Sequence, residues 1–269
     1  KIKMTQKCSG KKRIISFDLD MTLLNHKNWK IPDSALEALE LLRRDSVIVI
    51  ASGRNMDHEM SSMYKELINP DAIIHMNGTR VVAESEVLYE HFMDKERLRA
   101  LLTFAENRGI SLGLSVNGGD YYLNPDQVRA FDVIRWGESQ RSFKDAWKLI
   151  EMPVRTLVYI GGPKQAKMLQ EQFPDFKFPM FSDKMGADIV EKECSKAKGL
   201  LRLCQYYRID RKETIAFGDS MNDYEMLQEA GLGIAMGNAT DNLKTVADYV
   251  TDNIDEDGVW KACRYFHLI

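Results

Sequence analysis

Two clusters of acidic residues, far apart in the chain, carry the side chains best suited to chemistry. The first is Asp18 and Asp20, which follow an apolar run at residues 14–17 and precede the hydroxyl residue Thr22. Two carboxylates this close repel each other, so the pair is expected to share a cation or a proton. The simplest such arrangement is a divalent metal site in which one carboxylate stays free to act as a nucleophile.

The second cluster consists of Asp219, Asn222 and Asp223, which follow another apolar run at residues 214–217. In open parallel sheets, ligands bind at the carboxyl ends of the strands. Because both clusters follow strand-like runs, we predict that they form the two halves of one site.

Two further polar signals fit the same site. Ser52 and Arg54 follow the run 47–51, and Lys198 stands near the start of a helical stretch. A hydroxyl, a lysine and a metal held by aspartates suit phosphoryl transfer, which depends on charge neutralisation and positioning. Lys196 is a rival for the lysine, and only the glycine that follows Lys198 favours Lys198.

Strand-like runs and helical stretches alternate in the first and last parts of the chain. A β-branched run without polar residues is typical of a strand that is buried on both faces. This alternation predicts an α/β protein with a doubly wound (Rossmann-like) parallel-sheet core. The predicted strands are 14–17, 47–51, 72–76, 214–217, 231–236 and 249–251, and the predicted helices are 32–44, 56–67, 198–207 and 222–230.

The middle of the chain has another pattern. Paired strand signals, such as those on either side of a turn at residues 117–120, alternate with single helical stretches at 95–108 and 164–172. We therefore expect an inserted α+β domain at residues 85–188. The core would consist of the two segments on either side of it, residues 1–84 and 189–269.

The motifs together closely resemble those of the haloacid dehalogenase superfamily of phosphohydrolases. The similarity indicates the Cof-type branch, which has a large α/β cap between its second and third motifs. It covers nearly all of the core and rests on position and length in the cap. The residues and segments that carry it are Asp18, Asp20, Thr22, Ser52, the turn 76–78, Lys198, the segment 218–223 and the tail 253–259.

The resemblance implies a role for each motif residue. Asp18 would attack phosphorus and form an aspartyl-phosphate, while Asp20 would protonate the leaving oxygen and later deprotonate water. This double role needs a pKa near the working pH, as expected beside a second carboxylate. The implied Mg²⁺ ligands are Asp18, the Asp20 backbone carbonyl, Asp219 and Asp223; the implied phosphate-binding residues are Ser52, Lys198 and Asn222; Arg54, Asn77 and Met21 are expected to touch substrate.

The function implied by the resemblance is Mg²⁺-dependent hydrolysis of a small phosphorylated metabolite, such as a sugar phosphate. The alternatives are a phosphomutase or phosphotransferase, and a phosphoester-binding regulatory protein without turnover. Met21, which stands where the family usually has glycine, is the only feature that favours the last. A bulky side chain there could narrow the mouth or change the substrate choice. Neither the individual substrate nor an oligomeric state is predicted.

Composition sets limits on the class of protein. A formal net charge of -3 argues against a general nucleic-acid binder. No apolar run approaches the ~20 residues of a membrane span, and residues 1–13 lack the apolar centre of a secretion signal. The four cysteines, Cys8, Cys194, Cys204 and Cys263, are scattered, which predicts reduced thiols in a cytoplasmic protein.

Several other patterns are predicted to be structural. Met56, Met60 and Met63 share helical spacing and are expected in the core. Trp136 is expected to pack, and the acidic run at 252–257 is expected to be a solvated loop.

Overall fold

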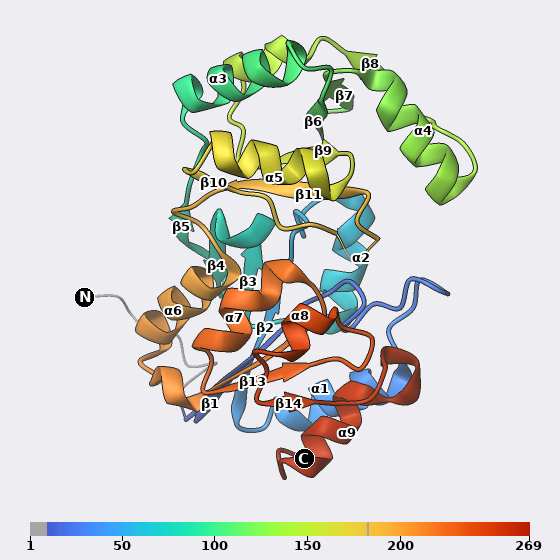
Figure 1. The fold of residues 1–269 in the computed structure, drawn as a ribbon. Coiled ribbons are helices and arrows are strands. Elements are labelled where there is room, and N and C mark those ends of the chain that lie inside the picture. The colour runs from blue at the N-terminus through green and yellow to red at the C-terminus, as the bar shows by residue number, and fades with distance from the viewer. Residues whose placement is uncertain (1–9, 182) are drawn as a thin grey trace. The chain divides into compact units, whose positions relative to one another are not determined.

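The computed structural model describes residues 10–181 and 183–269, so Cys8 lies outside the described residues. The chain divides into two compact units (Figure 1). The larger comprises the chain up to Glu90 together with Cys194–Ile269, and the smaller is His91–Glu193. Within the described residues, no helix has the length and apolar character needed to cross a membrane.

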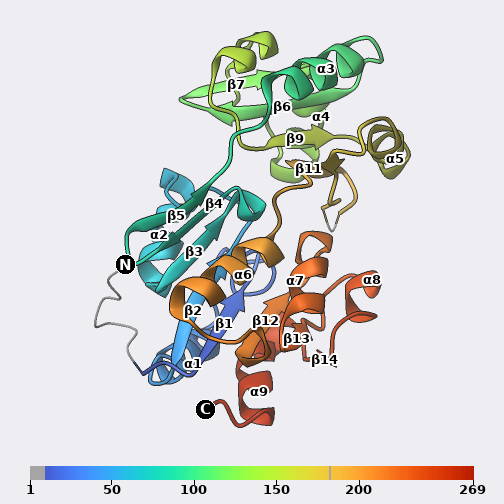
Figure 2. The ribbon, with the colours of Figure 1, turned by 90° about the vertical axis from the view of Figure 1, so that its left-hand side faces the viewer.

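The described part of the larger unit contains an eight-stranded sheet. Six neighbouring strands run parallel, and the last two are antiparallel to their neighbours and lie at one edge (Figure 2). Across the sheet the strands are β14 (Tyr249–Val250), β13 (Leu232–Ala235), β12 (Thr214–Gly218), β1 (Arg13–Phe17), β2 (Ser46–Ala51), β3 (Ala72–His75), β4 (Arg80–Ala83) and β5 (Glu86–Glu90).

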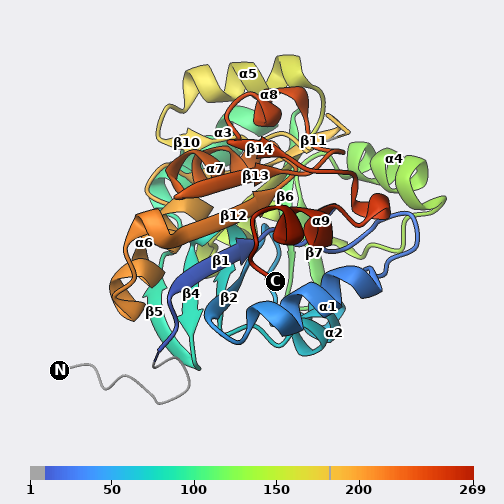
Figure 3. The same cartoon turned by 90° about the horizontal axis from the view of Figure 1, so that it is seen from below.

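Helices cover both faces of this sheet. Every residue of β2 is buried, as its run of Val and Ile predicts for a strand with helices above and below. On one face lie α1 (Asp33–Leu42) and α9 (Gly258–Tyr265), and on the other α6 (Lys196–Tyr207) and α7 (Tyr224–Glu229) (Figure 3). The doubly wound α/β class predicted from the sequence is confirmed. The remaining helices of this unit are α2 (Glu59–Ile68) and α8 (Asp241–Lys244).

The smaller unit is an α+β structure. Its six strands, counted over the described residues, form a sheet in which only the β7–β8 pair is parallel. The strands lie in the order β10 (Phe176–Lys177), β11 (Gly186–Glu191), β9 (Leu157–Ile160), β6 (Ser111–Val116), β7 (Gly119–Tyr122) and β8 (Phe143–Lys144), and the helices are α3 (Lys95–Glu106), α4 (Pro125–Trp136) and α5 (Pro163–Gln172).

The boundaries of the two units differ from those expected. We placed the insert at 85–188, whereas the compact unit is His91–Glu193. The difference at the first boundary has a clear cause, because β5 pairs with β4 and so extends the larger sheet. A turn made by Glu84 and Ser85, both with positive φ, joins these two strands.

Helix α4 was not predicted. It begins at Pro125 and ends at Trp136, and the glycine that follows, Gly137, has a φ of 84°. Proline at the start and glycine just past the end mark a helix, so a signal was present. Its last residue, Trp136, is 53% exposed rather than packed and contacts the ring of Phe131 edge-on.

The methionine prediction is wrong for two of three residues. Met56 is buried, but Met60 and Met63 are 73% and 61% exposed. Met56 lies before the helix, and the buried side of α2 is formed by Ser61, Tyr64 and Ile68. The spacing of Met56, Met60 and Met63 therefore spans a loop and the helix that follows it, and does not mark one face of a single helix.

The two points where the chain leaves and re-enters the larger unit lie together. Tyr89, at the exit, has its hydroxyl 3.9 Å from the sulfur of Cys194, at the re-entry. At the corresponding ends of the smaller unit, His91 and Arg97 hydrogen-bond to the buried carboxylate of Glu191 at 2.6 and 3.0 Å. Each unit thus holds the two connecting segments next to each other on its own side.

Candidate active site

The predicted polar residues gather at one edge of the larger sheet. β1 lies between β12 and β2, which is where the order of strands along the chain reverses. The residues that follow these strands, Asp18, Asp219 and Ser52, leave the sheet side by side. Their backbones are fixed, since the Asp18 N–H donates to the Phe217 carbonyl at 3.0 Å and that of Ser52 to Ile74 at 2.9 Å.

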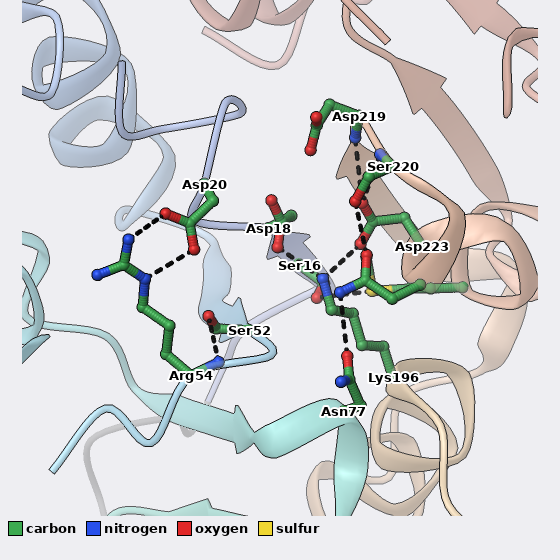
Figure 4. Close-up of polar contacts among 12 residues, drawn as sticks. Ser16, Asp18, Asp20, Ser52, Arg54, Asn77, Lys196, Asp219, Ser220 and Asp223 are labelled. Atoms are coloured by element: carbon green, nitrogen blue, oxygen red, sulfur yellow. Dashed lines mark hydrogen bonds and ion pairs between the residues drawn. The ribbon is translucent and has the colours of Figure 1, made fainter. Parts of the chain in front are cut away.

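Asp18 and a buried lysine form the centre of the site (Figure 4). The Nζ atom of Lys196 lies 2.6 Å from Oδ1 of Asp18 and 2.7 Å from Oδ1 of Asp223. Burial raises the pKa of Asp18 to about 7, although the charge of Lys196 lowers it. The negative charges of Asp223 and Asp20 act in the same direction as burial. Burial alone would lower the pKa of Lys196, but the two carboxylates outweigh burial and raise it, so the lysine stays charged.

The lysine at this centre is Lys196, so we replace the predicted Lys198. Helix α6 begins at Lys196, with Ser195 as its N-cap, and Lys198 lies about 200° further around the helix. The glycine that favoured Lys198 has another purpose. A Cβ on Gly199 would lie 2.6 Å from a methyl carbon of Ile74, so glycine lets the helix approach β3.

Three aspartates are arranged to hold a cation. Carboxylate oxygens of Asp18, Asp219 and Asp223 all lie within 4.8 Å of one another. Among the residues that the structure describes, the buried Oδ1 of Asp219 has no hydrogen-bond partner. Burial and then the charges of Asp18 and Asp223 raise the pKa of Asp219 well above its usual range. An oxygen-rich, partly unsatisfied site of this kind fits a hard divalent cation such as Mg²⁺.

Asp223 organises this loop. Its Oδ2 accepts hydrogen bonds from the backbone N–H groups of Asp219 and Ser220, each at 3.1 Å, and its Oδ1 accepts from Lys196. A Cβ on Gly218 would lie 2.5 Å from the Cβ of Asp223, so only glycine leaves room for this side chain. Asp18 and Asp219 therefore remain the carboxylates with oxygens available to a cation.

Asp20 points to other partners. Arg54 donates to both of its oxygens, from Nε at 2.8 Å and from a terminal nitrogen at 2.5 Å (Figure 4), and Nε2 of His26 lies 2.7 Å from Oδ1. Burial would raise the pKa of Asp20, but the hydrogen bonds from His26 and Arg54 outweigh burial and lower it to about 2. The expected pKa near the working pH is thus not found, because the Arg54 guanidinium and the hydrogen bond from His26 stabilise the carboxylate.

The other predicted residues line the same edge. Ser52 is buried and its Oγ accepts the backbone N–H of Arg54 at 3.0 Å. The Asn77 N–H donates to the Ser52 carbonyl at 3.0 Å, and Asn77 Oδ1 accepts from the amide of Asn222 at 3.0 Å. A Cβ on Gly78 would clash with the Ser195 backbone at 2.1 Å, so this turn packs directly against the start of α6.

Met21 adopts the backbone conformation that glycine tolerates best. Its φ of 59° lies in the left-handed region, where a side chain costs roughly 1–2 kcal/mol. The Met21 carbonyl accepts a hydrogen bond from the side-chain amide of Asn238 at 2.8 Å. Asn238 in turn accepts the N–H of Ile254 at 2.9 Å, which ties the turn after Asp20 to the C-terminal segment.

His26 and Asn238 were missed by sequence reasoning. A single histidine and a single asparagine in loops follow no catalytic spacing, so the sequence offered no specific signal for either. Chemically, the site combines a buried carboxylate held by lysine, a cation site and an anchored second carboxylate. This set suits attack by a carboxylate oxygen on an electrophile that carries negative charge.

Comparisons with known proteins agree with this geometry. The sequence pattern of haloacid dehalogenase-like hydrolases matches residues 15–263. The 5-amino-6-(5-phospho-D-ribitylamino)uracil phosphatase YitU of Bacillus subtilis is 27% identical over 269 residues, which cover 95% of this chain and 98% of that protein. The HMP-PP phosphatase of Klebsiella pneumoniae is 28% identical over 238 residues, 86% of each chain.

Solved structures show the same fold. The subclass IIB sugar phosphatase BT4131 superposes with a TM-score of 0.84 at 28% identity, covering 96% of this chain and 100% of that one. The phosphatase BT1666 from Bacteroides thetaiotaomicron gives a TM-score of 0.87 at 26% identity and covers 99% of both chains. The resemblance inferred from the motifs is confirmed.

Proposed function

Because the chain belongs to the haloacid dehalogenase-like hydrolase family and is a phosphatase of that family, we propose that it hydrolyses a small phosphomonoester through an aspartyl-phosphate, with Mg²⁺. The observation that carries this proposal is the position of Asp18. Its carboxylate is held by Lys196 at 2.6 Å, beside an oxygen of Asp219 that has no hydrogen-bond partner among the described residues. A nucleophile next to a cation site is what attack on a phosphate dianion requires.

Asp18 is the proposed nucleophile. One of its oxygens forms a bond to phosphorus while the ester P–O bond breaks. Lys196 keeps the attacking carboxylate oriented. In the second half of the reaction, water attacks phosphorus and releases phosphate from Asp18.

Asp20 is the proposed acid and base. It gives a proton to the leaving ester oxygen and then takes one from the attacking water. In the structure it is a carboxylate held by Arg54, which is the form needed for the second half. Donation in the first half requires that Asp20 first gain a proton.

Mg²⁺ is proposed to be held by the side chains of Asp18 and Asp219 and the backbone carbonyl of Asp20, with Asp223 behind them. When bound, it would neutralise charge on the phosphoryl oxygens and on the three aspartates. The raised pKa values of Asp18 and Asp219 support this role, because a nearby cation would offset both the burial and the carboxylate repulsion that raise them.

Ser52 and Asn222 are proposed to bind the phosphoryl oxygens, and Arg54, Asn77 and Met21 to contact the substrate. Lys196 takes the place of Lys198 in this set. The insert is proposed to select the leaving group. Sugar phosphates and similar monoesters are the proposed substrates, because BT4131 is named a sugar phosphatase and YitU is named for a phosphoribityl compound. A cytoplasmic location, which the buried thiols of Cys204 and Cys263 fit, belongs to the same proposal.

The test is a hydrolysis screen over phosphorylated metabolites with Mg²⁺ and without added acceptor. We expect steady release of inorganic phosphate, loss of activity in EDTA and its return with Mg²⁺. Asp18→Asn should lose about 10⁴-fold or more in kcat, as removal of a nucleophile does. A matched control is Asp255→Asn, which changes a carboxylate in the exposed acidic loop.

Each contrary result has a distinct meaning. Full activity of Asp18→Asn would refute the nucleophile. Phosphate release only when an acceptor is supplied would favour a phosphotransferase or mutase. Tight binding of phosphoesters with no turnover in either assay would favour a regulatory protein.

A further inference from the structure

His26 contacts the carboxylate of Asp20 but lies outside every motif discussed above. Its Nε2 is 2.7 Å from Asp20 Oδ1. Since an ionised carboxylate can only accept hydrogen bonds, the ring nitrogen must be the donor. His26 is partly buried, with 24% of its side chain exposed.

The loop that carries His26 is firmly built. Asn25 and Lys30 close it as a bridge, and the Trp29 N–H donates to the Asn25 carbonyl at 2.7 Å. The Asn25 side chain is buried and accepts the N–H of Lys27 at 2.9 Å. These bonds fix the loop backbone without help from the His26 side chain.

The imidazole is also fixed. It stacks on the ring of Trp29, with centroids 4.6 Å apart and an angle of 23° between the rings. The carbonyl of Trp29 accepts a hydrogen bond from the Tyr64 hydroxyl at 3.3 Å, which anchors the loop to helix α2. The histidine therefore meets Asp20 as a preset donor.

Arg54 and His26 divide the two oxygens of Asp20 unequally. Oδ2 accepts one hydrogen bond, from Arg54 Nε, whereas Oδ1 accepts two, from Arg54 and from His26. A bidentate arginine alone already pairs the charge. The added contact restrains rotation of the carboxyl group and leaves Oδ2 as its less engaged oxygen.

We propose that His26 is a positioning residue for the reaction: it orients the Asp20 carboxyl group so that Oδ2 exchanges the proton with the leaving oxygen. This inference rests on the proposed function. When the ester P–O bond breaks, a proton passes from Asp20 to the departing oxygen as Asp18 bonds to phosphorus. Misplacement of Asp20 should harm only reactions in which the leaving oxygen needs that proton.

Two kinds of ester separate this role from a structural one. An alkyl phosphate such as a sugar phosphate leaves as a strongly basic alkoxide and depends on the acid. In p-nitrophenyl phosphate the leaving group is stable as an anion and does not. General acid catalysis is worth about 10²–10⁴-fold, so loss of its positioning should be measurable.

The experiment compares kcat for both esters, with Mg²⁺, in the wild type, His26→Ala, His26→Gln and Lys27→Ala. We expect His26→Ala to lose about tenfold or more in kcat on the alkyl ester, with little change in its KM and little change on p-nitrophenyl phosphate. His26→Gln keeps an N–H donor and should recover most of the loss. Lys27 pairs with Asp255 on the surface, so its variant should match the wild type.

The outcomes distinguish this inference from the function on which it rests. If the wild type hydrolyses both esters and His26→Ala is slowed equally on both, or is not slowed at all, the proposed role of His26 is overturned while the proposed function stands. A wild type that hydrolyses neither ester overturns the proposed function and this inference with it. Thermal unfolding of each variant shows whether any uniform loss reflects the fold.

Discussion

Asp18 and Asp20 are separated by one residue, yet the structure treats their carboxyl groups in opposite ways. The pKa of Asp18 is raised to about 7 and that of Asp20 is lowered to about 2. Asp18 is buried, and it shares a single lysine with Asp223. Asp20 is half-buried and has a bidentate arginine and a histidine to itself.

The difference shows that the ratio of cations to carboxylates, and not the motif, decides the charge state. One lysine cannot neutralise the three buried aspartates Asp18, Asp219 and Asp223. The site around Asp18 therefore has excess negative charge, which favours the binding of a metal ion. The Asp20 side is already compensated by Arg54. One short motif therefore provides both a cation site and an anchored carboxylate.

The largest expected effect comes from removing the shared lysine. Lys196→Met would leave Asp18 and Asp223 buried without their common cation, which should lower the free energy of unfolding by about 3–5 kcal/mol. Chemical denaturation measures this directly. Lys198→Met, two residues along the same helix and partly exposed, should lower it by only about 1 kcal/mol, as a typical point substitution does. Equal effects of the two variants would break the distinction between the buried lysine and its neighbour.

The pH dependence should separate the two carboxylates. The folded pKa of Asp18 lies above its ordinary value, so the folded state holds a proton that the unfolded state has lost between about pH 4 and 7. Without metal, Asp18 should therefore make stability fall as pH rises through that window. Asp20 has a lowered pKa, so its contribution to stability is present above about pH 4 and is lost as pH falls toward 2.

Denaturation at several pH values tests these signs. Asp18→Asn should flatten the decline between about pH 4 and 7, whereas Asp20→Asn should remove part of the stability gained above pH 4. Carboxyl ¹³C titration gives the two pKa values directly. An Asp18 pKa below that of Asp20 would reverse the comparison.

The smallest effect concerns Met21, where the backbone turns directly after Asp20. At ordinary positions alanine is more stabilising than glycine, by about 0.5–1 kcal/mol in a helix. With a φ of 59°, Met21 should show the reverse order, and Met21→Gly should be more stable than Met21→Ala by about 1 kcal/mol. Thermal and chemical unfolding of the two variants give the sign. Met63, exposed on α2, serves as the control position where alanine should be favoured.

The sequence was most informative about the place of residues that come directly after a buried strand. Runs such as 47–51 are fully buried strands, and polar residues directly after them must lie at the carboxyl edge of a parallel sheet. Asp18, Ser52 and Asp219 could be placed together on that basis.

Prediction failed where the outcome depended on rotation about a helix or on single loop contacts. Lys196 and Lys198 differ only in which side of α6 they occupy. The glycine after Lys198, on which the choice of Lys198 depended, is required instead by the close packing of the helix against Ile74. His26 acts through a loop whose shape depends on a buried asparagine and a tryptophan stack. Such contacts are tertiary and leave no periodic pattern in the chain.

The closeness of Tyr89 and Cys194 has a consequence for the history and engineering of this protein. Because the polypeptide leaves and rejoins the larger unit at adjoining positions, a stretch of any length can be exchanged there without stretching the scaffold around it. A few flexible residues joining Glu90 to Cys194 should bridge the gap. Grafted inserts from relatives could then give one chemistry new selectivities.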